Sequence, residues 1–160
     1  MIICKNFLTK DEFDSVEKAI MGDRFPWYFN DMIVDGNDGF HQFTFSFILD
    51  GKKNCTSVTM NILKPILDKI KYKKIKRIKA NLLTKTEKII EHGFHTDYPN
   101  ITTGIFYLNT CDGYTKFKNG KKIKSEKNKY VEFNSNLSHT GSTCTDEKRR
   151  VVINFNYIWI

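Results

Sequence analysis

Two stretches organise the sequence: GFHTDYPNITTGIFYLNT (residues 93–110) and LSHTGSTCTDEKRRVVINFNY (residues 137–157). The first holds an imidazole and a carboxylate two residues apart, His95 and Asp97. On an extended strand, residues i and i+2 point to the same face, so both groups can be directed at one point. The second stretch supplies another imidazole, His139. Two neutral imidazoles and one carboxylate form a facial set of metal ligands that leaves coordination positions open.

The hydrophobic period around these stretches predicts short strands. From Lys74 onward it changes from 3.6 to 2, and turn residues separate the alternating runs. Asn119-Gly120 between two such runs is a strong signal for a hairpin. The strands expected are Ile75–Leu83, Phe94–Asp97, Thr103–Asn109, Tyr114–Lys118, Lys121–Ser125, Tyr130–Phe133 and Arg150–Trp159.

The last of these strands has two different faces. If Arg150 faces the barrel interior, the opposite face is apolar throughout, comprising Val151, Ile153, Phe155 and Tyr157. The other phase would bury Asn154 and Asn156 against helices, where unpaired amides cost ~1–3 kcal/mol each. The pattern therefore predicts that Arg150 lies inside and that Arg149 lies at the rim or in solvent.

The first half of the chain predicts helices. Thr9 and Glu12 have the spacing of a capping box, followed by apolar residues at helical period. Residues 41–50 alternate as a strand, and residues 56–71 return to helical period, with Pro65 predicting a kink or a late start. Helices followed by short strands predict a mainly β (α+β) fold, with helices on one face of a β-sandwich or double-sheet barrel.

Length and composition indicate one domain of a globular protein. The chain has 160 residues, of which 40% are hydrophobic and 28% charged. We expect a single domain over residues 1–160, with helical support over about 1–72 and the β core over about 74–160. No window has the ~20 apolar residues of a membrane span. The four cysteines are widely spaced without a C-x-x-C, which is typical of reduced thiols in the cytoplasm.

The net charge of +8 comes mainly from two lysine-rich runs, Lys69–Lys79 and Lys116–Lys129. One interpretation is a patch for nucleic acid or an acidic partner. The other is a solvated surface in a chain rich in lysine, and this is favoured because charge runs usually mean only solubility.

Several motifs occur in a particular order in Gly93–Trp159: His95-x-Asp97, Ile105-Phe106-Tyr107-Leu108-Asn109, Gly113-Tyr114-Thr115-x-Phe117, His139 and Arg150. With them the region resembles the Fe(II)/2-oxoglutarate-dependent dioxygenases, specifically the prolyl-4-hydroxylase-like branch with its small phage-encoded members. The resemblance implies a double-stranded β-helix (jelly-roll, cupin-like) core. One departure is that the family often has two glycines ahead of Thr115, and only Gly113 is present here.

The resemblance also implies a site. His95, Asp97 and His139 would be the metal-binding and catalytic residues, holding Fe(II) and leaving positions for 2-oxoglutarate and O2. Arg150 would pair with the distal carboxylate of 2-oxoglutarate, since a bidentate arginine suits a carboxylate. The remaining cosubstrate-binding residues would be Tyr107, which bonds the same carboxylate, Ile105 and Thr115, which line the pocket, and Asn154. An ordinary core tyrosine is an equal alternative for Tyr107.

The activity implied is hydroxylation of an unactivated C–H bond, on a protein side chain and, by closest resemblance, a prolyl residue. Substrate-facing residues are expected in Arg24–Gly39 and Leu83–Gly93. Two alternatives stay open: a nucleic-acid-directed oxygenase of the same fold, and a catalytically inactive jelly-roll binding module. The expected location is the cytoplasm, that of the host cell if a virus encodes the chain, without a membrane partner.

Overall fold

A computed structural model describes residues 1–34 and 39–160. Its helices are α1 (Lys10–Met21), α2 (Ser57–Asn61) and α3 (Lys64–Leu67). Its strands are β1 (Ile2–Cys4), β2 (Tyr28–Asn30), β3 (Gln42–Leu49), β4 (Lys52–Lys53), β5 (Tyr72–Thr84), β6 (Thr102–Tyr107), β7 (Tyr114–Phe117), β8 (Lys122–Lys124), β9 (Lys129–Asn134), β10 (His139–Gly141) and β11 (Arg149–Trp159).

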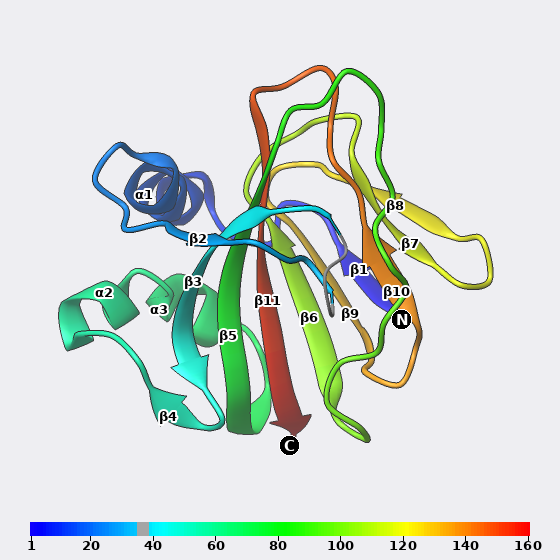
Figure 1. Ribbon diagram of the computed structural model, residues 1–160. Helices are drawn as coiled ribbons and strands as arrows, with labels where there is room; N and C mark the ends of the chain where they lie inside the picture. Colours follow the sequence, from blue (N-terminus) through cyan, green and yellow to red (C-terminus); the bar gives the residue numbers. More distant parts are fainter. Residues whose placement is uncertain (35–38) are drawn as a thin grey trace.

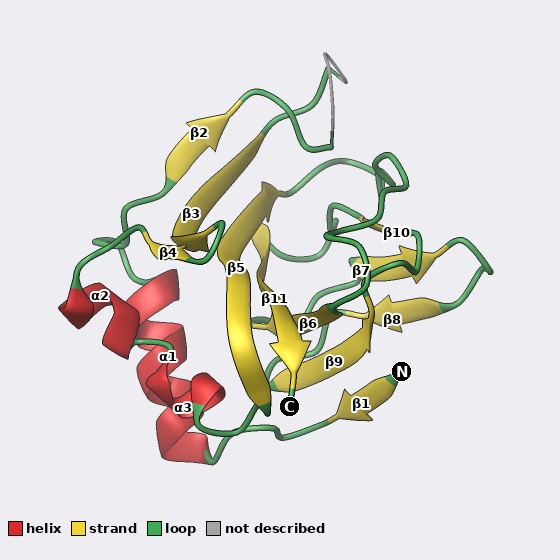
Figure 2. Cartoon of the chain, turned by 90° about the horizontal axis from the view of Figure 1, so that it is seen from below, coloured by secondary structure: helices red, strands yellow, loops and turns green. Residues whose placement is uncertain are grey.

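The strands form two antiparallel sheets. The larger has the order β1-β9-β6-β11-β5-β3-β2, with β4 paired to β3, and the smaller has the order β10-β7-β8. The long strands β5 and β11 run side by side at the centre of the larger sheet (Figure 1). The helices lie on one side of this sheet and the smaller sheet lies on the other (Figure 2). This mainly β architecture confirms the predicted double-stranded β-helix core.

The helices begin where the sequence predicted. Thr9 Oγ1 accepts a hydrogen bond from the Glu12 amide, and the Thr9 amide donates to the Glu12 carboxylate at 2.8 Å, which completes a capping box. The second helical region is divided into α2 and α3, and Pro65 lies in the first turn of α3, where its missing amide hydrogen costs nothing.

The two faces of β11 pack as predicted. Its apolar face joins the core cluster that contains the buried face of α1, and this cluster includes Phe13, Val16, Ile20, Val151, Ile153, Phe155 and Tyr157. On the opposite face, Val152 belongs to a second cluster between the two sheets, together with Ile105, Tyr107 and Phe117. The interior between the sheets is therefore the side on which Arg150 lies.

The strand predictions need two corrections. Residues 94–97 do not form a strand, because only His95 makes a β-bridge there and the chain turns at Tyr98-Pro99. The short strands β1, β2, β4 and β10 were not predicted, since runs of two or three residues carry little periodicity. The hairpin at Asn119-Gly120 is confirmed: β7 pairs with β8, and Gly120 has a φ of 89°. Among the described residues, no helix is long and apolar enough to cross a membrane.

Candidate metal and cosubstrate site

His95 and His139 are brought together by their backbones. The His95 amide donates to the His139 carbonyl at 3.0 Å, and the His139 amide donates back to the His95 carbonyl at 2.9 Å. This reciprocal pairing places the two imidazole rings 4.7 Å apart. The Asp97 amide donates to the Ser135 carbonyl at 3.3 Å, so residues 95–97 lie alongside residues 135–139. Only Thr96 separates His95 from Asp97, and although this segment is not a strand, both side chains are directed toward His139.

The three side chains form a set of ligands suited to a divalent metal. One donor atom each of His95, Asp97 and His139 lies within 4.8 Å of the others. The Nδ1 atom of His139 lies 2.9 Å from the Leu137 carbonyl, and that of His95 lies 3.3 Å from the Gly93 carbonyl. When Nδ1 donates to a carbonyl, Nε2 keeps the lone pair that binds a metal. The donor set and its orientation thus fit Fe(II).

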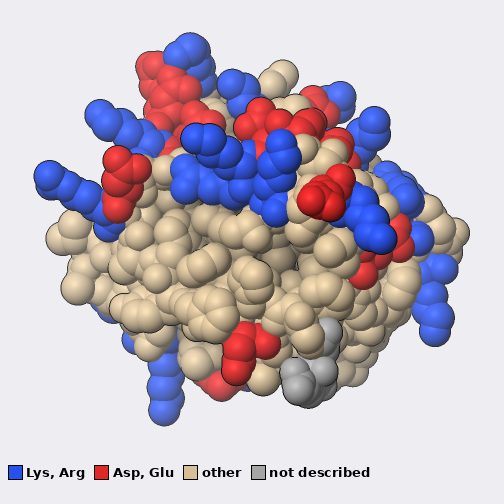
Figure 3. Space-filling view, turned by 45° about the horizontal axis from the view of Figure 1, so that its top comes forward, with Lys and Arg blue, Asp and Glu red and all other residues tan. Residues whose placement is uncertain are grey.

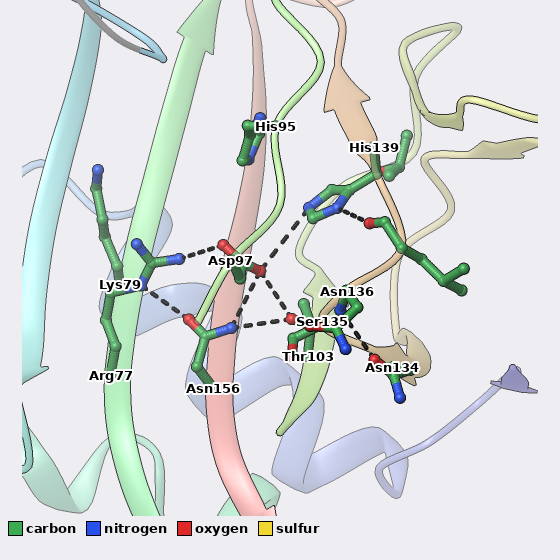
Figure 4. A network of polar contacts seen from close by, with 12 residues as sticks. Arg77, Lys79, His95, Asp97, Thr103, Asn134, Ser135, Asn136, His139 and Asn156 are labelled. Atoms are coloured by element: carbon green, nitrogen blue, oxygen red, sulfur yellow. Dashed lines mark hydrogen bonds and ion pairs between the residues drawn. The ribbon is translucent and has the colours of Figure 1, made fainter. Parts of the chain in front are cut away.

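Asp97 is held by a network that the sequence did not reveal (Figure 4). Arg77 Nη2 donates to Asp97 Oδ1 at 2.7 Å. Thr103 Oγ1 at 2.7 Å and Asn156 Nδ2 at 3.0 Å donate to Asp97 Oδ2. Arg77 Nε also donates to Asn156 Oδ1 at 2.8 Å, which ties the two donors to each other. The sequence placed Arg77 and Asn156 on predicted strands, but the register between these strands, which brings both residues to Asp97, could not be predicted from it.

This network sets the charge of the carboxylate. Burial alone would raise the pKa of Asp97, but the charges of Arg77 and His139 and the hydrogen bonds from Thr103 and Asn156 outweigh burial and lower it. Burial lowers the pKa of His139. At neutral pH the site therefore presents an ionised carboxylate and a neutral imidazole, the forms that bind a metal.

Arg150 is a buried cation. It is 3% exposed, and its guanidinium donates to Thr115 Oγ1 at 3.1 Å, Ser125 Oγ at 3.2 Å and the Ser142 carbonyl at 3.4 Å. No carboxylate of a described residue lies within ion-pair distance of it. Burial lowers its pKa, although arginine stays protonated in proteins. A buried cation without an anion is costly unless a ligand supplies one.

The neighbours of Arg150 include other predicted cosubstrate residues. Tyr107 is fully buried, and its hydroxyl donates to Thr115 Oγ1 at 2.9 Å, the same oxygen that Arg150 contacts. Gly113 is required here, because a Cβ at this position would lie 2.7 Å from Cδ of Arg150. Arg149, expected at the rim or in solvent, is half-exposed, and its Nη2 donates to the carbonyl of Met21, the last residue of α1, at 2.6 Å.

A cavity of about 470 Å³ connects these groups. Its lining includes His95, Asp97, Arg77, Arg150 and Asn154. The predicted residues Ile105, Tyr107 and Thr115 are not part of the lining; they are buried behind it.

The two segments expected to face a substrate also reach the cavity. Ile33 and Val34 come from Arg24–Gly39, of which residues 35–38 lie outside the described part of the chain. Leu83 and His92 come from the segment Leu83–Gly93.

The lysine-rich runs are partly neutralised by neighbouring carboxylates. Lys69 lies 3.1 Å from Glu12, Lys116 lies 2.6 Å from Glu91, and Lys129 pairs with Glu126 at 2.9 Å. Basic and acidic side chains also interleave along the upper edge of the face shown in Figure 3. This mixture favours a solvated surface over a continuous track for phosphates.

Comparison with known proteins identifies the fold. No family model and no curated protein sequence matches the chain. A prolyl hydroxylase from Trichoplax adhaerens, in complex with a hypoxia inducible factor peptide fragment, is 15% identical over 98% of this chain and 82% of its own, with a TM-score of 0.71. A 2OG-Fe(II) oxygenase family oxidoreductase from Burkholderia pseudomallei is 12% identical over 92% and 78%, with a TM-score of 0.64.

A third similar structure is SnoN, a non-heme alpha ketoglutarate dependent epimerase from nogalamycin biosynthesis. It is 11% identical over 98% of this chain and 76% of its own, with a TM-score of 0.66. The same fold thus occurs in proteins described as hydroxylases and as an epimerase, so fold similarity does not decide the reaction. The protein has the fold of the 2-oxoglutarate- and Fe(II)-dependent oxygenases, with prolyl hydroxylases among the similar structures.

Proposed function

We propose that the protein is an Fe(II)- and 2-oxoglutarate-dependent dioxygenase that hydroxylates an unactivated C–H bond. The observation that carries this proposal is the buried Arg150, which lacks an anionic partner among the described residues and shares a cavity with His95 and Asp97. A metal triad alone would suit many reactions. A triad beside an unpaired buried guanidinium suits a cosubstrate that carries one chelating carboxylate and one distant carboxylate.

Each residue has a distinct task in this proposal. His95, Asp97 and His139 would hold Fe(II), which supplies the oxidative chemistry with O2 and 2-oxoglutarate. Arg150 would bind the distal carboxylate through charge-assisted hydrogen bonds. Thr115 orients Arg150, and Tyr107 in turn donates to Thr115. Ile105 and Val152 keep this part of the interior apolar, which strengthens the ion pair by excluding water.

Arg77, Thr103 and Asn156 keep the carboxylate of Asp97 ionised and fixed in direction. Partners of this kind raise metal affinity because they restrict the ligand before the metal arrives.

The proposed substrate is a protein side chain, with prolyl favoured. Support comes from the Trichoplax adhaerens structure, whose partner is a peptide fragment. The apolar cavity residues Ile33, Val34 and Pro99 would suit the ring of a prolyl residue.

Turnover of the cosubstrate tests the proposal directly. Purified protein with Fe(II), ascorbate and O2 should convert 2-oxoglutarate to succinate, slowly without substrate, and Asp97→Ala and His139→Ala should abolish this. Anaerobic Fe(II) with 2-oxoglutarate should give a weak visible charge-transfer band that both variants lose. Asn136→Ala is a matched control, since this exposed residue contacts Asn100 rather than the triad.

The alternatives predict other results. A folded protein that neither binds Fe(II) nor consumes 2-oxoglutarate would be an inactive binding module. A nucleic-acid-directed oxygenase would show turnover stimulated by oligonucleotide and an affinity that falls steeply with salt.

A further inference from the structure

The cavity contains a third cation that the proposed reaction does not use. Lys79 lies on β5 two residues after Arg77, on the same face of the strand, and both line the cavity. Figure 4 shows the two side chains next to each other, with Arg77 turned to Asp97 and Lys79 extending past it. No described residue forms a hydrogen bond or an ion pair with the ammonium of Lys79. Arg77 is paired with Asp97, and Arg150 has its own proposed anion.

The described cavity residues carry a net positive charge that binding of Fe(II) and 2-oxoglutarate would not neutralise. Among the described residues, the lining holds three cations, Arg77, Lys79 and Arg150, and one carboxylate, Asp97. Fe(II) would add two positive charges and 2-oxoglutarate would add two negative charges. The filled site would keep a net positive charge in a partly desolvated volume, where an additional anion is bound more strongly than in water.

The surroundings of Lys79 agree with this. It is half-buried, and burial together with the charge of Arg77 lowers its pKa, although Asp97 acts in the opposite direction. A partly desolvated ammonium beside an arginine gains from any anion that approaches it.

A second polar side chain, that of Asn154, lies on the strand next to Lys79. Asn154 on β11 is the direct neighbour of Lys79 on β5 and lines the same cavity. Its Oδ1 atom is buried and has no hydrogen-bond partner among the described residues. Its Nδ2 atom donates to no described residue and is therefore free to donate to a ligand in the cavity. Lys79 and Asn154 thus offer donors from neighbouring strands to one volume, next to the metal triad.

We propose that Lys79 and Asn154 form an anion subsite that receives a carboxylate of the primary substrate. The inference rests on the proposed function and names the substrate class: a side chain or peptide with an acidic group next to the C–H bond that reacts. The apolar residues Ile33, Val34 and Pro99 of the same lining would contact the uncharged part of that substrate. The 2-oxoglutarate carboxylate that chelates the metal is a second source of the same chemistry, and the experiment separates the two.

The test uses Mn(II) as a paramagnetic probe in place of Fe(II), without oxygen. Binding of Mn(II) and then of 2-oxoglutarate is measured first, by water proton relaxation. Acetate and its uncharged isostere acetamide are then titrated into the complex, and relaxation of their methyl protons is recorded. Acetate should give a saturable enhancement that acetamide lacks. In Lys79→Met the acetate affinity should fall by about tenfold or more, the effect of a lost charge-assisted hydrogen bond.

Two further variants complete the design. Lys79→Arg keeps the cation and should keep the acetate signal, which separates charge recognition from a packing effect. Lys73→Met removes an exposed lysine of the same strand and should change nothing.

Each contrary result has its own meaning. Equal relaxation of acetate and acetamide, or an unchanged acetate affinity in Lys79→Met, overturns the subsite. A tenfold loss of 2-oxoglutarate affinity in Lys79→Met assigns the ammonium to the cosubstrate and also overturns it. Failure of Mn(II) to bind the wild-type protein appears in the first titration, before acetate is added, and rejects the proposed function together with this inference.

Discussion

The two faces of β11 differ although they are made from alternate residues of one strand. One face packs against the helices through Val151, Ile153, Phe155 and Tyr157, and these four side chains are fully buried. The other face carries Arg150, Val152, Asn154 and Asn156 toward the cavity and the candidate metal ligand Asp97. The apolar face stabilises the fold, whereas the polar face holds a cation and two amides that are costly to bury without partners. Alternate residues of the strand therefore serve stability and ligand binding. Substitutions on the apolar face should lower stability, whereas those on the polar face should lower ligand affinity.

The largest effect is expected on the apolar face. Phe155→Ala should lower the free energy of unfolding by ~3–5 kcal/mol, because it removes a fully buried ring and leaves a cavity. Urea denaturation measures this. On the other face, Asn154→Ala should change stability by less than ~1 kcal/mol, since no hydrogen bond within the described chain ends on its side chain. Similar losses for both variants would show that the faces are not separate.

The second effect concerns Arg150. Arg150→Met should weaken 2-oxoglutarate binding by ~1.5–3 kcal/mol or more, the contribution of charge-assisted hydrogen bonds to a buried partner. Stability should stay the same or rise, because a buried cation without an anion is removed. Calorimetric titration and thermal unfolding give the two values. Arg149→Met is the matched control, and a larger loss of binding there than in Arg150→Met would mean that the role assigned from the strand phase is wrong.

The third effect tests the contacts of Asp97. Arg77→Leu and Asn156→Leu should each lower the affinity for Co(II) or Fe(II) by ~10–100-fold, as is usual for groups that orient a metal ligand. Arg77→Lys keeps a cation but lacks the fork that contacts both Asp97 and Asn156, and its loss should be intermediate. Unchanged metal affinity in all three variants would show that Asp97 needs no such support.

A smaller effect is expected at Arg149. Its hydrogen bond to the Met21 carbonyl satisfies the end of α1, so Arg149→Ala should cost ~1 kcal/mol of stability and leave 2-oxoglutarate affinity unaltered. Thermal unfolding is the appropriate measurement. A weaker affinity for 2-oxoglutarate without any change in stability would place Arg149 in the site instead.

The smallest effect belongs to the basic surface. Replacing Lys71, Lys73 and Lys74 together by glutamine should shift stability by no more than ~0.5 kcal/mol and leave cosubstrate turnover unchanged, because all three are exposed. If the wild-type protein instead binds a generic oligonucleotide with a log–log salt slope of several units, and this variant reduces the slope by about three, the run is a phosphate-binding surface.

The long strands and the capped helix could be predicted from the sequence because their information is local. Alternation along β11 defines both of its faces, and the capping box of Thr9 and Glu12 marks the start of α1. His95-x-Asp97 and His139 were recognisable by their spacing and order. Residues 94–97 were expected to form a strand, but one bridge to His139 is enough to bring the two imidazoles together.

The support of the site could not be predicted, because it depends on register. The register of β5 and β11 places Arg77 directly beside Asn156, and from this position Arg77 reaches Asp97. Nothing in the amino-acid pattern states which residues of two long strands face each other. For the same reason the positions of Lys79 and Asn154 as direct neighbours emerge only from the structure.

The reciprocal backbone pairing of His95 and His139 has a consequence for redesign. Amide and carbonyl groups are the same in every residue, so the backbone spacing of His95 and His139 is set without any side chain. We therefore expect this backbone pairing to persist when residues of the cavity wall are exchanged. On the proposed function, a library restricted to wall positions such as Ile33, Val34 and Leu83 would vary substrate selectivity around a fixed pair of histidines. The proposed enzyme would in this respect be a small modular scaffold for engineering oxidation catalysts.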